Sequence, residues 1–119
     1  MSEAPLLDRA ILDELIDSIG DDGARSVIEL FIDESRGHLE TIAAAAALSH
    51  DIAARERAGR AAHSLKSAAG QIGAAAMAAA AAAVERAAAA AAPDLPQTVA
   101  ALDRCGAATA AVLTAFLGR

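Results

Sequence analysis

The chain has 119 residues, which suits one domain with a modest core and leaves little room for a second domain. Hydrophobic residues make up 55% of the chain, but many are alanine and only two are Phe, with no Trp or Tyr, so we expect a thin core and closely spaced helices. The formal net charge of -6 argues against a nucleic-acid partner, because neutralising phosphates requires a broad basic surface.

Cysteine and alanine usage bear on where the protein works. Cys105 is the single cysteine of the sequence, so it cannot form a disulfide within the chain, and no charged segment followed by an apolar run opens the sequence. The longest uncharged stretches are alanine, which is too weakly apolar to hold a membrane span. The sequence therefore predicts a soluble protein without a membrane partner, with the cytoplasm as its default location.

The apolar pattern predicts helices throughout, because no stretch alternates apolar and polar residues as a strand does. A first, short helix is expected after Pro5, where apolar residues recur at helical spacing. The GDDG run at 20–23 ends this helix and supplies a capping carboxylate for the next one. The second helix is expected from about Ala24 to Leu48, with apolar residues on one stripe and charged residues on the other.

The third helix is expected to begin near Ile52, but alanine obscures its end. Fifteen of the nineteen residues from Ala74 to Ala92 are alanine, the strongest helix former. An unbroken helix would span about 60 Å at about 1.5 Å per residue, too long for so small a domain. Gly73 is the best stop signal, because glycine takes a left-handed C-terminal cap without steric cost. A fourth helix then covers about Ala75–Ala92.

The last helix follows a turn at 93–96 that contains two prolines, and it carries apolar residues at helical spacing as far as Phe116. Four long helices and one short helix joined by short connections predict an all-α fold. We expect an antiparallel up-down-up-down four-helix bundle with an additional short N-terminal helix packed on it. Residues 1–119 are expected to form this single domain.

A histidine stands out on the third helix, in the stretch AAHSLKSAAGQIGA at 61–74. At about 100° per residue, the apolar residues of this helix fall about 160 to 240° away from His63, which therefore points outward. Five small or basic residues lie within about 60° of it: Gly59, Arg60, Lys66, Ser67 and Gly70. Glycine inside a helix costs up to about 1 kcal/mol against alanine, so the two glycines suggest that something approaches closely here.

The residues around this histidine resemble the signature of histidine-containing phosphotransfer (HPt) domains. That signature has a His, a Leu or Phe two positions on, a Lys three on, a Gly or Ser four on and a Gly ten on, matched here by His63, Leu65, Lys66, Ser67 and Gly73. The apolar spacing of residues 12–35 and the position of Glu85 late in the fourth helix are similar to the family's layout. The resemblance covers nearly all of the chain, and it implies the same helical bundle.

The resemblance implies that His63 accepts a phosphoryl group from a phospho-aspartate receiver domain and passes it to another receiver or response regulator. The metal ion, expected to be Mg²⁺, and the acceptor aspartate then belong to the partner, so no cofactor or metal is expected on this chain. A nucleotide site is also absent from the sequence, which has neither a GxGxxG nor a GxxxxGK[ST] motif, so ATP-dependent autokinase activity is not expected. We expect a monomer.

The residue types suit this chemistry. A neutral imidazole is a nucleophile near pH 7, and Lys66, one turn further along, can meet the phosphoryl oxygens. Arg60, one turn back, can assist phosphoryl transfer or can attract an acidic receiver. Gly70 has no side chain, so that a partner's pocket can reach the imidazole. Ser67 replaces the commoner glycine and adds a hydroxyl that can bond a phosphoryl oxygen. Gln71, about 80° from the histidine, is a candidate for the rim of the site.

Less specific interpretations remain open for several of these residues. Arg60 can be a plain surface charge, Gly59 can relieve packing with a neighbouring helix, and Gly73 is more a structural stop than a contact. The rival functions are a non-catalytic alanine-rich adaptor that binds a partner helix or homodimerises, and a bundle that has kept the HPt shape without transfer activity.

Overall fold

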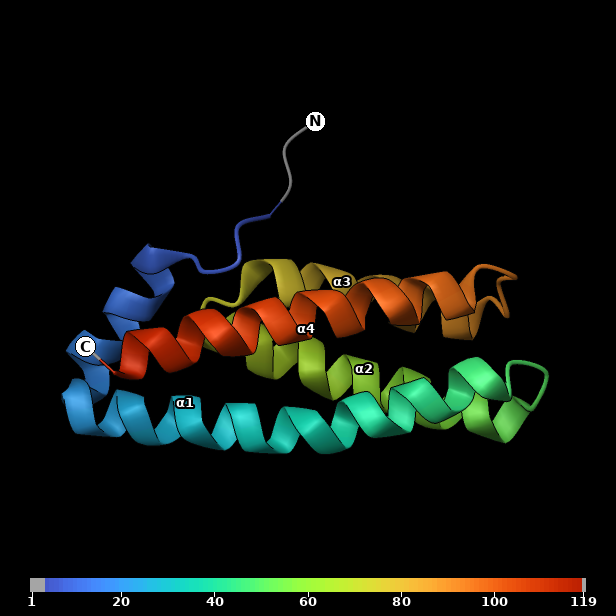
Figure 1. Ribbon diagram of the computed structural model, residues 1–119, viewed down its shortest axis with the longest axis horizontal. Helices are drawn as coiled ribbons and strands as arrows, with labels where there is room; N and C mark the ends of the chain where they lie inside the picture. Colours follow the sequence, from blue (N-terminus) through green and yellow to red (C-terminus); the bar gives the residue numbers. More distant parts are fainter. Residues whose placement is uncertain (1–3, 119) are drawn as a thin grey trace.

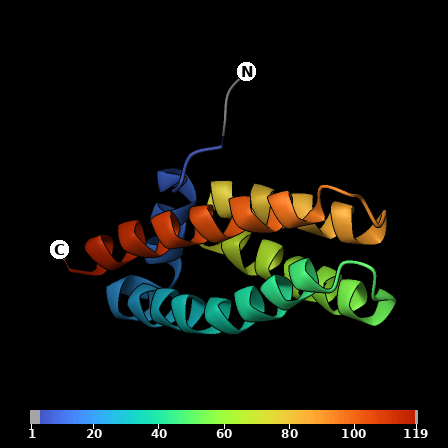
Figure 2. The ribbon, with the colours of Figure 1, turned by 45° about the vertical axis from the view of Figure 1, so that its right-hand side comes forward.

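The computed structural model describes residues 4–118, which form four helices and no strand. They are α1 (Arg9–Ala47), α2 (Ile52–Gln71), α3 (Ala75–Ala89) and α4 (Leu95–Leu117). Successive helices run in opposite directions along the molecule and pack side by side, and α4 returns to lie against α1 (Figure 1). Figure 2 shows the same closed arrangement from another side. The described chain is thus the all-α antiparallel bundle that the sequence predicted.

The structure does not give the short N-terminal helix as a separate element. The predicted boundary at residues 20–23 falls inside α1, where Gly20 takes a φ of 79° and a ψ of 171°. Glycine has no Cβ and tolerates this φ, so the chain changes direction at one residue and resumes the helix at once. A kink therefore replaces the expected connection, and the first segment of α1 turns away from the long remainder (Figure 1).

Helix α2 has well-defined ends. Asp51 caps its start by accepting hydrogen bonds from Ala53 N at 2.9 Å and Ala54 N at 3.3 Å. Beyond its end, Gly73 takes a φ of 80° and its carbonyl accepts a hydrogen bond of 2.6 Å from Asp8 N. The segment before α1 thereby ties the α2–α3 turn to the start of the chain's first helix.

Alanine supplies much of the core. The inner face of α2 buries five alanines and Leu65, while the other helices add a few larger side chains. The fully buried large apolar residues outside α2 include Leu12, Ile28, Ile42, Met77, Leu102 and Leu113.

Helix α3 ends at Ala89, three residues before the predicted end, and Ala91 turns the chain with a φ of 50°.

Helix α4 is long and apolar enough to cross a membrane by length and composition alone, with a mean hydropathy of 1.3 over its most apolar window. In the bundle, however, Leu95, Val99, Leu102 and Leu113 are buried against the other helices. Packing within the core therefore accounts for part of the apolar character of this helix, since 28% of that window is buried.

Candidate functional site

The outer face of α2 presents His63 to solvent. Its side chain is 62% exposed, whereas Leu65, two residues further along, is completely buried. Arg60, Ser67 and Gly70 are exposed on the same helix. The imidazole is thus reachable from outside while the helix that carries it is anchored in the core.

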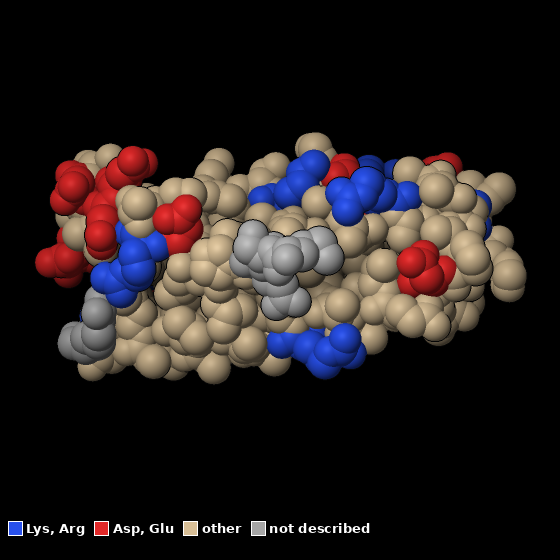
Figure 3. Space-filling view, turned by 90° about the horizontal axis from the view of Figure 1, so that it is seen from above, with Lys and Arg blue, Asp and Glu red and all other residues tan. Residues whose placement is uncertain are grey.

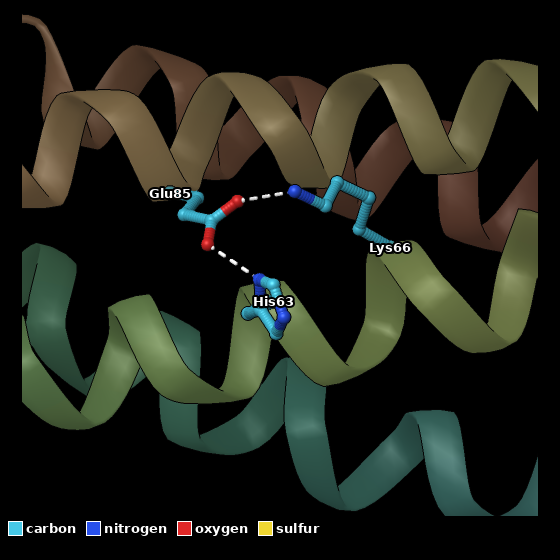
Figure 4. A network of polar contacts seen from close by, with 3 residues as sticks. All are labelled: His63, Lys66 and Glu85. Atoms are coloured by element: carbon cyan, nitrogen blue, oxygen red, sulfur yellow. Dashed lines mark hydrogen bonds and ion pairs between the residues drawn. The ribbon is translucent and has the colours of Figure 1, made fainter.

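A carboxylate from the neighbouring helix contacts the histidine. Glu85 of α3 places Oε2 at 2.7 Å from Nδ1 of His63, and its Oε1 accepts a hydrogen bond of 2.8 Å from Nζ of Lys66. Figure 4 shows the carboxylate bridging the two side chains of α2. Lys66 is 37% exposed and Glu85 is 31% exposed, so the three groups form one partly shielded cluster at the helix–helix boundary.

The cluster controls which nitrogen of His63 carries a proton. The hydrogen bond from Lys66, and then the one from His63, hold the pKa of Glu85 below its ordinary value, so this carboxyl is ionised at neutral pH. An ionised carboxylate only accepts hydrogen bonds, so Nδ1 must be the donor. In a neutral imidazole this leaves the lone pair on Nε2, the nitrogen turned away from Glu85 (Figure 4).

A groove of about 690 Å³ runs along the boundary between α2 and α3 beside this cluster. Gly59, Arg60, His63 and Glu85 are among the residues that line it. Arg55 also lines it but donates a hydrogen bond of 2.8 Å from Nη1 to the carbonyl of Ser49, which ties it to the α1–α2 connection. The imidazole therefore stands in the wall of a groove that also carries charged side chains.

The two glycines inside α2 have no packing partner in the described chain. A Cβ added to Gly59 or Gly70 would meet no heavy atom within 4 Å among residues 4–118. The alternative that Gly59 relieves packing with a neighbouring helix is therefore wrong. At Gly73, by contrast, a Cβ would lie 2.7 Å from the carbonyl oxygen of Asp8.

Gln71 lies apart from the histidine cluster. It is the last residue of α2, is exposed, and lines a second groove on the opposite side of the helix, toward α1. The structure thus brings together His63 and Lys66 but not Gln71.

Charge is unevenly distributed over the surface. Acidic side chains gather at the end of the molecule where the first segment of α1 lies, and basic side chains gather nearer its middle (Figure 3). The sequence accounts for this, because residues 8–22 hold six acids and one base whereas residues 52–73 hold four bases and one acid. The site therefore sits in a locally basic part of an acidic protein.

Glu85 is the site residue that the sequence analysis missed, since it entered there only as part of a family layout. Glu85 and Arg86 are the charged pair within the alanine tract of α3. A charge in so uniform a helix was the available signal, but nothing in the sequence indicated which neighbour it faces. Among residues 4–118, no three His, Cys, Asp or Glu side chains gather as metal ligands would.

Comparison with known proteins gives two matches. The family model described as "Hpt domain" matches residues 26–115. The crystal structure of histidine-containing phosphotransfer protein B (HptB) from Pseudomonas aeruginosa PAO1 superposes with a TM-score of 0.86 at 23% sequence identity and covers 98% of each chain. No curated protein sequence matches this chain significantly. At this identity the structural match shows a shared fold.

Proposed function

The chain belongs to the Hpt domain family and is a histidine phosphotransfer protein of a phosphorelay, and on this premise we propose that His63 is the residue that carries the phosphoryl group. The observation that supports this assignment is the hydrogen bond between Nδ1 of His63 and the ionised Glu85. It leaves Nε2 exposed as the nucleophile.

In the proposed step, the Nε2 lone pair attacks the phosphorus atom of a phospho-aspartate on the partner. An Nε2–P bond forms, the P–O bond to the aspartate breaks, and the aspartate leaves as a carboxylate with the electron pair of that bond. Positive charge then develops on the imidazole ring. Glu85, bonded to Nδ1, stabilises this charge and keeps the ring in orientation, as a carboxylate does for the histidine of a catalytic triad.

Lys66 supplies the positive charge that faces the phosphoryl oxygens. Its ammonium has three donors, and one of them already binds Glu85 on the side of the imidazole. A second donor can reach a phosphoryl oxygen without breaking that bond. Catalysis of phosphoryl transfer consists mainly of such positioning and electrostatic stabilisation. Arg60 and Ser67, exposed on the same face, are proposed as partner contacts.

Proteins of this family work with receiver domains in phosphorelays, and we propose receivers as both donor and acceptor here. The proposal requires no cofactor on this chain, because the divalent metal ion, Mg²⁺, belongs to the receiver. We further propose that the protein is a monomer that acts in the cytoplasm, without a nucleic-acid or membrane partner. The net charge of -6 supports the monomeric state and the absence of a nucleic-acid partner.

The test is transfer from a receiver domain labelled with radioactive phosphate. We expect the wild-type protein to take up a label that is stable in base and labile in acid, and His63→Gln to take up none. His38→Gln and His50→Gln are the matched controls and should be labelled as the wild type is. Label retained in His63→Gln would refute the assignment, and an adaptor would take up no label in any variant.

A further inference from the structure

A negative charge lies beside the place where this protein must hold a phosphoryl group. Oε2 of Glu85 is 2.7 Å from Nδ1 of His63, on the ring that the proposed function loads through its other nitrogen. A phosphoryl group is itself anionic, so a carboxylate in this position repels it. An uncharged acceptor, such as an amide oxygen, would fix the same tautomer of the ring without that repulsion. The tautomer alone therefore does not explain the charge of Glu85.

Glu85 is the charged group in contact with the imidazole. The charged side chains that line the groove beside His63 are Arg55, Glu56, Arg60 and Glu85, and within residues 4–118 neither α1 nor α4 contributes to that groove. Of these described side chains, Glu85 alone is hydrogen-bonded to the ring. Lys66 reaches the other oxygen of the same carboxylate, and Arg86 is exposed outside the groove. The protonation of Nδ1 is therefore governed from one neighbouring atom, Oε2 of Glu85.

Glu85 keeps its negative charge at neutral pH. The hydrogen bond from Lys66, and then the one from His63, hold the pKa of Glu85 below its ordinary value. Both carboxylate oxygens are thus held in place by α2 (Figure 4). A fixed carboxylate favours positive charge on a ring that it contacts. After loading, it therefore favours the ring with a proton on Nδ1 and phosphorus on Nε2 over the same ring without the proton.

The proton on Nδ1 decides how readily the loaded ring gives up its phosphoryl group. When the aspartate of a receiver attacks the phosphorus atom, an O–P bond forms, the Nε2–P bond breaks, and the electron pair of the broken bond returns to Nε2. A ring that has kept its proton on Nδ1 leaves as a neutral imidazole. A ring that has lost it leaves as an imidazolate anion, which is a much stronger base and a poorer leaving group. Loss of the proton would therefore slow the discharge step.

We propose that Glu85 holds the proton on Nδ1 of His63 through loading and discharge alike, and that this retained proton allows the phosphorylated ring to pass its phosphoryl group to a receiver. The inference rests on the proposed function and concerns its second half, the release step. Glu85 touches none of the exchanged atoms, so it is a positioning residue that acts through the imidazole. Neither half of the reaction then takes a proton from solvent, because the proton present on Nδ1 at the start is still there at the end.

Glu85→Gln tests the charge, because the amide oxygen can still accept the hydrogen bond from Nδ1. Glu56→Gln is the matched control, since Glu56 lines the same groove and makes no hydrogen bond to the imidazole in the described chain. Each protein is loaded with phosphoramidate, a small donor that needs no receiver. Discharge to a receiver that labels the wild type is then followed at a series of pH values, and rates are compared between proteins at the same pH.

An ordinary imidazole loses its second proton at about pH 6.5, so about one ring in a hundred keeps it at about pH 8.5. We expect Glu85→Gln to discharge about 10- to 100-fold more slowly than the wild type at about pH 8.5, and within about threefold of it at about pH 5.5. Glu56→Gln should follow the wild type at every pH. A defect of Glu85→Gln that is the same at every pH would overturn the inference, because orientation of the ring alone would then explain it.

Phosphorus NMR of the loaded proteins reads the same proton without a receiver. The phosphorus signal of the wild type should stay constant from about pH 6 to 8, whereas the signals of Glu85→Gln and of free phosphohistidine should titrate in that range. A wild type that titrates with the free compound would overturn the inference, whether or not the variant folds.

The proposed function fails in a different way. A wild-type protein that takes up no label at His63 from either phosphoramidate or a phosphorylated receiver would refute the acceptor, and the inference with it. A labelled wild type with the pH profile of Glu85→Gln would overturn the inference alone and leave His63 as the acceptor.

Discussion

Gly70 and Gly73 are three residues apart, yet the fold treats them in opposite ways. Gly70 lies in a regular helix with open space where a Cβ would be, whereas Gly73 takes a φ of 80° and its missing Cβ leaves room for the carbonyl of Asp8. The fold requires the second glycine and gives no reason for the first. The short stretch around His63 therefore mixes residues that the fold requires with residues that it does not require.

The largest expected effect concerns the turn. Gly73→Ala places a Cβ 2.7 Å from a backbone oxygen and forces a left-handed conformation that costs about 1 to 2 kcal/mol in itself. With overpacking added, we expect the free energy of unfolding to fall by at least about 2 kcal/mol in urea denaturation. A loss below about 1 kcal/mol would show that the turn can rearrange and would remove the contrast with Gly70.

The next effect concerns the outer face and should leave the fold intact. A hydrogen bond to a charged group contributes about 1.5 to 3 kcal/mol, so Lys66→Ala should slow phosphoryl transfer about 10- to 100-fold. The free energy of unfolding should change by less than about 1 kcal/mol, because the pair with Glu85 is partly exposed. Arg57→Ala, on the same helix but outside the α2–α3 groove, is the control. Equal rates for both variants would exclude Lys66 from the site.

A smaller effect of opposite sign is expected at the two open glycines of α2. Gly59→Ala and Gly70→Ala should each raise the free energy of unfolding by about 0.5 to 1 kcal/mol, because alanine is the better helix former and a Cβ has room. Urea denaturation of the single variants measures this. Destabilisation by either change would mean that the glycine serves the fold after all, as Gly73 does.

The smallest effect is electrostatic. Because folding lowers the pKa of Glu85, its hydrogen bonds stabilise the protein above the carboxyl's ordinary pKa, and this stabilisation is lost as the pH falls through the lower folded value. The stability difference between the wild type and Glu85→Gln should therefore shrink in acid. Carboxyl NMR should show the Glu85 titration below its ordinary range, and Lys66→Ala should move it back, since Lys66 is the largest cause. An unchanged titration would leave Lys66 without influence on this carboxylate.

The helices could be predicted because their ends carry chemical signals. Asp51 marks the start of α2, Gly73 the turn after it, and the prolines at 93 and 96 the start of α4. At Gly20 the same kind of signal gave a wrong prediction, a connection between two helices. A glycine with a positive φ ends one helix, and the sequence does not show whether a loop or a further helical turn follows it. Only packing of the first segment decides between them.

The part of the candidate site that lies on α2 was predictable from the sequence. The contact that Glu85 makes from α3 was not. The helical angles placed His63, Lys66 and Ser67 on one face of α2, because the apolar residues of that helix define its orientation. Helix α3 has no such contrast, since alanine occupies both its inner and its outer positions. The direction of Glu85 thus depends on how α3 crosses α2, which is a property of the folded bundle.

The small buried side chains of α2 and α3 affect whether Glu85 can reach His63. Helices α2 and α3 pack against each other, and both bury alanines, among them Ala58, Ala62, Ala81 and Ala88. The distance between two helix axes varies by about 2 Å with the bulk of the side chains at their contact. A glutamate arm has a fixed length, so leucines in these places would pull the carboxylate out of contact with the imidazole. In this protein the small volume of alanine keeps the two helices close enough for Glu85 on one to contact His63 on the other.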